Sequence, residues 1–205
     1  GSYVGGLFVF ESKLTQEFRL HFDEKIAEMF QSIGIREGSV WIEVFHDGEN
    51  YYFNEVGFRY GGSVSIYPVD YFYQINQVAA DIHYALTGES CISEHTSLIR
   101  STLPRKKYYC IYPVHINAGT ISSISGLDKI AQLENIVYLA TTKYLHDRIE
   151  SSGSFSQVFA LVHFVCNTTE ECIQTIDRIH QMLVVFDEHG NNMVNRMLDV
   201  GKIIF

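Results

Sequence analysis

Two apolar-rich segments flank a tight turn between residues 38 and 62, in the stretch GSVWIEVFHDGENYYFNEVGFRYGG. Apolar alternation on both sides of an Asp-Gly turn predicts an antiparallel β-hairpin over residues 39–57. Each strand carries one carboxylate, Glu43 or Glu55. Because their separation is even, a three- or five-residue loop would place the glutamates opposite each other on one face, whereas a two-residue loop would place them on opposite faces.

Opposed glutamates need a compensating positive charge. Like charges directly across a β-ladder destabilise it, and burial beside aromatic side chains raises the cost of keeping both ionised. A magnesium ion would offset the repulsion, because it takes carboxylate oxygens and fills its remaining positions with waters and substrate phosphates. The alternative is a pair of solvent-facing glutamates with no ligand. Strand alternation predicts that the glutamate face also carries Trp41, Phe45, Tyr51 and Phe53.

A cationic residue and two glycines follow the second strand. The same alternation places Gly57 and Arg59 on the glutamate face, where the guanidinium fork would suit a phosphate or carboxylate group. Gly61 and Gly62 would let the backbone approach a ligand closely. The predicted site therefore combines two acidic residues, one arginine and a glycine pair.

Helices and further strands surround the hairpin. Apolar residues at helical spacing predict a helix from Ser12, which can cap it, to Gly34, which can end it. A second helix is predicted over residues 69–88, and a strand precedes the first helix at residues 4–10. Further strands are predicted at residues 107–116, 135–145, 157–165 and 183–186, with a turn and short helix at 117–134 and a helix at 168–182.

The order of these elements predicts the fold class. Strands and helices mix without strict alternation, which indicates an α+β fold of mixed α/β layers, with an antiparallel sheet and packed helices. An irregular stretch rich in Ser, Thr and Glu suggests a boundary near residue 90. We therefore expect two domains, residues 1–90 with the hairpin and residues 91–205 as a small carboxyl-terminal α+β subdomain.

Charge and hydropathy exclude several classes of partner. The formal net charge is −9, and the longest basic run is Arg105-Lys106-Lys107, so no nucleic-acid partner is expected. No segment is apolar enough to predict a membrane span, and the start of the chain has no secretory signal pattern, so a cytoplasmic location is expected. The four cysteines are widely spaced without a C-x-x-C pair, which argues against zinc and predicts small core residues.

The motif order around the hairpin resembles the carboxyl-terminal half of an ATP-grasp domain. The resemblance rests on SIGIREGSVWIEVF, YYFNEVGFRYGG and VDYFYQINQVAADIHYALTGES, which together cover about residues 10 to 90. Two later stretches are similar, more loosely, to the carboxyl-terminal subdomain of the biotin-carboxylase and carbamoyl-phosphate-synthetase branch. These stretches are YYCIYPVHINAGTISSISG and FALVHFVCNTTEECIQTIDRIHQMLVVFDEHG.

The resemblance implies an ATP-dependent ligase that joins a carboxylate to an amine through an acyl-phosphate, with ATP and Mg²⁺ as cofactors. By position, Glu43 and Glu55 correspond to the magnesium ligands of the family. Arg59 corresponds to the arginine that holds the phosphoryl or acyl group, and it is the expected catalytic residue. Small-molecule carboxylate and amine substrates are the implied partners, and a homodimer is left open.

Two departures from the family pattern bear on activity. Gly57 stands where the Glu-x-Asn-x-Arg motif has asparagine, and Asn54 is expected to alternate to the other face. The nucleotide lid of the family lies upstream of the matched part, so the chain is expected to be a fragment that is inactive by itself. The alternative is a degenerate, non-catalytic module for binding or oligomerisation.

Two histidines are candidate functional residues. His46 lies beside the hairpin turn and could touch a substrate, although a solvated loop histidine is the simpler interpretation. His163 alternates within an apolar strand, which predicts a core histidine with a hydrogen-bond partner.

Overall fold

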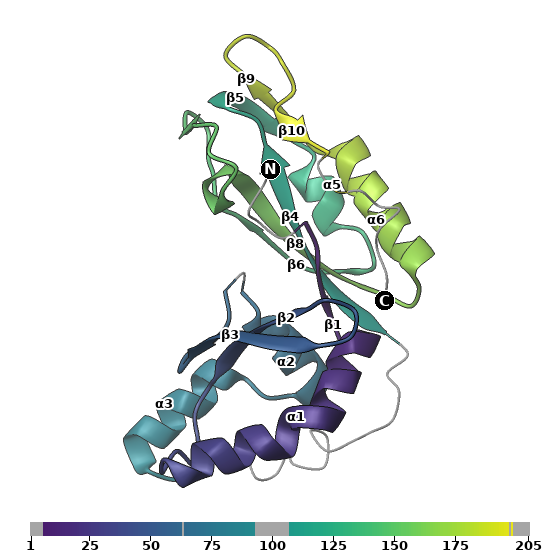
Figure 1. The fold of residues 1–205 in the computed structure, drawn as a ribbon. Helices are drawn as coiled ribbons and strands as arrows, with labels where there is room; N and C mark the ends of the chain where they lie inside the picture. The colour runs from purple at the N-terminus through teal and green to yellow at the C-terminus, as the bar shows by residue number, and fades with distance from the viewer. Residues whose placement is uncertain (1–5, 63, 93–106, 197, 199–205) are drawn as a thin grey trace. The chain divides into compact units, whose positions relative to one another are not determined.

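A computed structural model of the chain describes residues 6–62, 64–92, 107–196 and 198 (Figure 1). Its contacts divide the chain into two units. Unit 1 comprises Gly1–Glu17 and Arg105–Phe205, and unit 2 comprises Phe18–Pro104. The domain boundary expected near residue 90 stays a prediction.

Unit 1 is built on an antiparallel sheet. Its strand order is β1 (Phe8–Phe10), β4 (Tyr108–Ile116), β8 (Val158–Cys166) and β6 (Ile136–Thr141), and β10 (Val194–Asn195) also pairs with β4. The central strands β4 and β8 are almost continuously apolar, as expected for strands that are buried on both faces. A smaller sheet joins β7 (Arg148–Ile149), β5 (Gly119–Ser125) and β9 (Val184–Asp187).

Two helices pack on this sheet and close the main core (Figure 1). The helix α6 (Thr169–Met182) begins at Thr168, whose side chain accepts a hydrogen bond from the backbone of Glu171, so Asn167 and Thr168 form the helix entry. The short helix α5 (Leu127–Ala131) and a 3₁₀ turn at Phe155–Gln157 complete the unit. Buried aliphatic and aromatic side chains of β4, β8 and α6 supply most of the core.

Unit 2 holds the predicted hairpin. The helix α1 (Lys13–Ser32), which belongs to unit 2 from Phe18 onward, leads into β2 (Trp41–His46) and β3 (Tyr51–Gly57), and these are followed by α2 (Ile66–Tyr73) and α3 (Gln77–Thr87). The hydroxyl oxygen of Ser12 accepts from the backbone of Thr15 at 3.3 Å, and Gly34 has φ 85°, which confirms both predicted helix ends.

Two sequence predictions of local structure were wrong. The single helix expected over residues 69–88 is two helices, because Gln74 takes a left-handed conformation and Asn76 caps a new helix by accepting from the backbone of Ala79. The stretch 117–134 contains the strand β5 before its short helix, where only a turn and a helix were expected. The predicted fold class is confirmed, because every sheet pairing among the described residues is antiparallel and helices pack on the sheets.

Candidate metal and phosphate site

The hairpin of β2 and β3 brings the two glutamates together. Glu43 lies directly opposite Glu55 in the ladder, as the parity of their spacing allowed. The loop has a different length from the one expected, since residues 47–50 connect the pair His46 and Tyr51. A β-bulge between Glu43 and Val44 adds one residue on β3, and this extra residue restores the facing arrangement.

The extra residue of the bulge is Asn54. Its Nδ2 donates to Oε1 of Glu43 at 2.9 Å, so Asn54 contacts the glutamate pair instead of alternating away from it. The expectation that Asn54 lies on the other face was therefore wrong. The physical reason is that a bulge lets two successive residues of one strand oppose a single residue of its partner.

The bulge also changes which aromatic residues accompany the glutamates. Tyr51 and Phe53 contact Phe18 and Phe22 of α1, with ring centroids 5.3–5.9 Å apart. The pair Val44–Phe53 follows Glu43–Glu55 in the ladder and therefore points to the opposite face. The prediction that Tyr51 and Phe53 share the glutamate face is corrected by this register.

Arg59 lies beside the glutamate pair. Its Nη2 is 3.9 Å from Oε1 of Glu55, its guanidinium stacks 5.1 Å from the ring centroid of Trp41, and its Nη1 donates to the carbonyl oxygen of Tyr60 at 2.9 Å. The Arg59 and Glu55 side chains are 57% and 55% exposed, so the ion pair by itself adds little to stability. The aromatic stack and the carbonyl contact orient the guanidinium near the glutamates.

The glycines of the site have different surroundings. A Cβ on Gly61 would lie 2.6 Å from Oγ of Ser65 and 2.9 Å from Cδ1 of Trp41, so only glycine fits without movement. A Cβ on Gly57 would lie no closer than 3.4 Å to any atom, and a Cβ on Gly62 would meet nothing within 4 Å. Gly61 is therefore required by the packing of Trp41, which stacks on Arg59.

Tyr60 and Asp81 support the chain directly after the hairpin. Burial, together with a hydrogen bond and electrostatic repulsion from the Asp81 carboxylate, raises the pKa of Tyr60. Asp81 also accepts from Oγ of Ser39 at 3.1 Å, so one carboxylate of α3 ties together both ends of the hairpin. Neither Tyr60 nor Asp81 was selected from the sequence, because their partnership depends on the packing of α3.

The donor set fits a hard divalent cation. Two facing carboxylates and the amide of Asn54 offer oxygen donors, and the exposure of Glu55 leaves room for the waters that magnesium retains. A soft ion prefers sulfur or imidazole ligands, whereas the side chains of this group are carboxylates and an amide.

Known proteins resemble this chain in structure. No protein-family model matches it. No curated protein sequence matches it either. Solved structures do match. An L-amino acid ligase from Bacillus licheniformis superposes with a TM-score of 0.72 at 21% identity, and the match covers 91% of this chain and 45% of that protein.

Two other structures give the same result. Phosphoribosylglycinamide synthetase from Anaerococcus prevotii matches with a TM-score of 0.71 at 13% identity, covering 92% of this chain and 48% of that protein. The biotin carboxylase domain of Hydrogenobacter thermophilus 2-oxoglutarate carboxylase matches with a TM-score of 0.65 at 14% identity, covering 94% and 40%. The chain has the fold of part of an ATP-grasp protein. It spans less than half the length of each of these ATP-grasp structures.

The likeness confirms the resemblance found in the sequence at the level of the fold. At such low sequence identities a shared fold does not assign roles to individual residues. The roles of Glu43, Glu55 and Arg59 therefore stay predictions. The Hydrogenobacter structure is a dimer in complex with MgADP, ADP and bicarbonate. Within the described residues, no helix is long and apolar enough to cross a membrane.

The other sequence candidates lie outside this group. His46 stacks on Tyr51 with 4.5 Å between ring centroids, and its Nδ1 accepts from the backbone of Gly48 at 3.3 Å, so it contributes to the turn. His163 is fully buried, and its Nδ1 lies 3.0 Å from the hydroxyl oxygen of Tyr109, which confirms the predicted core histidine.

Proposed function

We propose that this chain is the carboxyl-terminal part of an ATP-dependent ligase that joins a carboxylate to an amine through an acyl-phosphate. Glu43 and Glu55 would hold a magnesium ion, and Arg59 would hold the phosphoryl or acyl group. ATP would be the phosphoryl donor. The observation that carries the proposal is the direct pairing of Glu43 with Glu55, with Arg59 beside them, on a chain with the ATP-grasp fold.

The exposed surface of unit 2 supports a role within a larger assembly. The helix α1 has no buried residue, and several large apolar side chains of the unit are exposed, including Leu20 at 80% and Leu86 at 81%. Such surface usually marks contact with another domain or subunit. The part of the ATP-grasp ligases that this chain does not span is a natural occupant, and a homodimer is the other arrangement that would cover it.

The residues of the site suggest how the chemistry would be divided. A bound magnesium ion would neutralise the negative charge of phosphate oxygens during transfer. A guanidinium group presents a fork of donors, so Arg59 can bind a planar carboxylate or an acyl-phosphate through two hydrogen bonds. Its stack on Trp41 positions the guanidinium before a substrate arrives, and such preorganisation is the main contribution that an enzyme makes to this type of reaction.

Asn54 would compensate for the asparagine of the family motif that is absent at position 57. In the bulge its amide contacts Glu43, so the glutamate pair keeps an amide neighbour although Gly57 provides none. Asn54 would hold the Glu43 carboxylate in place through its Nδ2, while its amide oxygen could accept from a metal-bound water. This replacement supports a functional metal site despite Gly57.

A second candidate is a non-catalytic ATP-grasp module for binding or oligomerisation. Gly57 favours it, because the asparagine of the family motif is absent on this strand. The exposed apolar surface of unit 2 would serve such a module equally well. Magnesium-dependent binding of nucleotide separates the two candidates.

The test uses the complete protein and ADP as the ligand, measured by calorimetry with and without Mg²⁺. We expect magnesium to tighten ADP binding. In the Glu55→Gln variant the affinity for ADP in the presence of magnesium should be at least about tenfold lower than in the wild type, because loss of a residue that only orients a metal ligand already costs about that much. Glu49→Gln, in the turn of the same hairpin, is the matched control and should behave like the wild type. ADP binding that is independent of magnesium in the wild type would favour the second candidate.

A further inference from the structure

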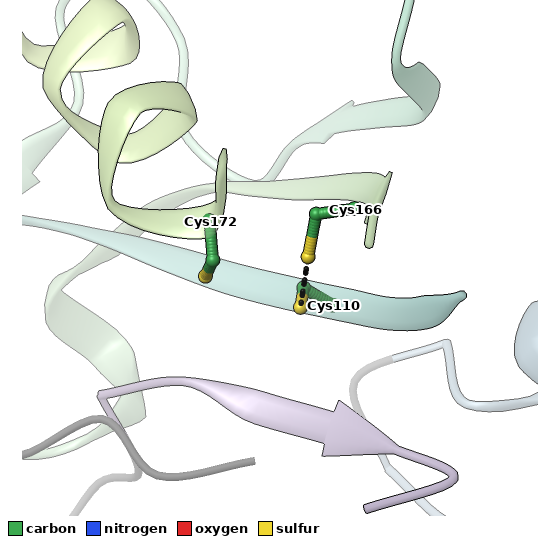
Figure 2. Close-up of side chains that lie close together, drawn as sticks. All are labelled: Cys110, Cys166 and Cys172. Atoms are coloured by element: carbon green, nitrogen blue, oxygen red, sulfur yellow. Dashed lines mark hydrogen bonds between the residues drawn. The ribbon is translucent and has the colours of Figure 1, made fainter. Parts of the chain in front are cut away.

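Three cysteines that are far apart in the sequence meet in the core of unit 1 (Figure 2). Cys110 lies on β4, Cys166 ends β8 and Cys172 lies in the first turns of α6. Their sulfur atoms all lie within 4.8 Å of one another, and the Sγ atoms of Cys110 and Cys166 are 3.7 Å apart. All three residues are at most 2% exposed.

The strand register argues against a disulfide between Cys110 and Cys166. Cys110 pairs with Phe164, and Cys166 pairs with Tyr108, so the two cysteines are diagonal neighbours across the ladder. Diagonal neighbours have Cα atoms roughly 7–8 Å apart. A disulfide needs Cα atoms closer than about 7 Å and Cβ atoms about 4 Å apart, so closing one here would require backbone movement.

The sulfur separations suit a shared metal ion instead. Metal–sulfur bonds of about 2.3 Å place sulfur ligands roughly 3.8–4.0 Å apart in tetrahedral or trigonal geometry. The separation of 3.7 Å between Cys110 and Cys166 is close to that value without any change in the backbone. Cys172 approaches from the helix, so the three sulfurs surround one point instead of lying in a row (Figure 2).

We propose that Cys110, Cys166 and Cys172 form a three-coordinate thiolate site for a soft, thiophilic metal ion of the Cu(I) type. Thiolate ligands select soft ions such as Cu(I). Structural zinc sites almost always have four protein ligands, whereas the group of possible metal ligands among the described residues has three. Each metal–sulfur bond replaces an S–H bond, and the displaced proton goes to solvent.

One further observation fits this site. Cys166 also lines a surface cavity of about 370 Å³, together with polar residues such as Asn167 and Glu171, so one member of the cluster adjoins space that opens to solvent. Cys166 is therefore the ligand that an incoming ion would meet first.

The test is anaerobic titration of the reduced full chain with Cu(I) in competition with a chromophoric Cu(I) chelator. We expect one Cu(I) to bind per chain. The variants Cys110→Ala, Cys166→Ala and Cys172→Ala should each weaken binding by more than about 100-fold, because loss of a residue that only orients a ligand already costs about 10- to 100-fold. Cys91→Ala is the matched control, since Cys91 is exposed, and it should leave binding unchanged.

Circular dichroism decides whether each variant is folded, and X-ray absorption of the Cu(I)-loaded wild type provides a reading that depends on no variant. Three sulfur ligands at about 2.3 Å would support the site. Two sulfur ligands, nitrogen or oxygen ligands, or failure of the wild type to compete with the chelator would overturn it. Folded triad variants that bind like the wild type, or loss of binding in Cys91→Ala, would overturn it as well.

Discussion

Gly57 and Gly61 lie four residues apart in the candidate site, but a side chain would meet different surroundings at each. At Gly61 a Cβ would collide with Ser65 and Trp41, whereas at Gly57 the nearest atom is the flexible Cγ of Arg59 at 3.4 Å. We therefore expect Gly61→Ala to lower the free energy of unfolding by about 1–3 kcal/mol, as overpacking does. Gly57→Asn should change it by no more than about 0.5 kcal/mol.

Urea unfolding followed by the fluorescence of Trp41, the only tryptophan in the chain, measures both variants. The Gly57→Asn variant also restores the amide of the family motif beside the glutamate pair, so it should bind a divalent cation more tightly than the wild type. The description of the two glycines would be wrong if Gly57→Asn cost as much stability as Gly61→Ala.

Asn54 shows what residue patterns could not predict. The even spacing of Glu43 and Glu55 allowed a facing pair, and Arg59 was placed beside them by simple alternation. A bulge, however, adds one residue to one strand and so shifts its alternation. Here the loop of residues 47–50 together with the bulge gives the same facing pair that a three- or five-residue loop without a bulge would give. The contact between Asn54 and Glu43, and the contacts of Tyr51 and Phe53 with α1, depend on this extra residue.

At the scale of elements, strand β8 carries a buried titratable group. Burial lowers the pKa of His163 to about 4, from an ordinary value of about 6.5. The unfolded chain therefore binds a proton at a higher pH than the folded chain does. The contribution of His163 to stability is complete above about pH 6.5 and is lost as the pH falls toward 4.

The expected loss at pH 5 is about 2 kcal/mol relative to pH 7.5. The variant His163→Phe removes this titration, so its unfolding free energy should fall less than that of the wild type over the same range. Urea unfolding at the two pH values, followed by circular dichroism, gives the comparison. Parallel losses in the wild type and the variant would show that His163 is not the group responsible.

Elements differed in how well the sequence predicted them. The helix α1 has a capping serine, a helical apolar period and a terminal glycine, so its bounds were predicted closely. The break between α2 and α3 depends on a left-handed Gln74, and glutamine gives no sequence signal for that conformation. The strand β5 was missed because Gly119 and a pair of serines weaken its apolar alternation.

At the scale of the whole molecule, the fold and the chemistry rest on different grounds. The ATP-grasp fold is shown by solved structures that match about nine-tenths of this chain. The metal assignment rests on the hairpin alone, because that likeness says nothing about individual residues. Clusters that depend on tertiary structure, such as Cys110, Cys166 and Cys172, could not be predicted from their sequence spacing, since β4, β8 and α6 bring them together only on folding.

The most direct measurement is the quenching of Trp41 fluorescence by Mn²⁺, which takes the same carboxylate and water ligands as Mg²⁺. Trp41 lies on β2 two residues from Glu43, so a cation between the glutamates would be near its ring. We expect saturable quenching that Mg²⁺ reverses, that is lost in Glu43→Gln and Glu55→Gln, and that is kept in Glu49→Gln. Quenching that is the same in all four proteins, or absent from the wild type, would contradict a metal site at the hairpin.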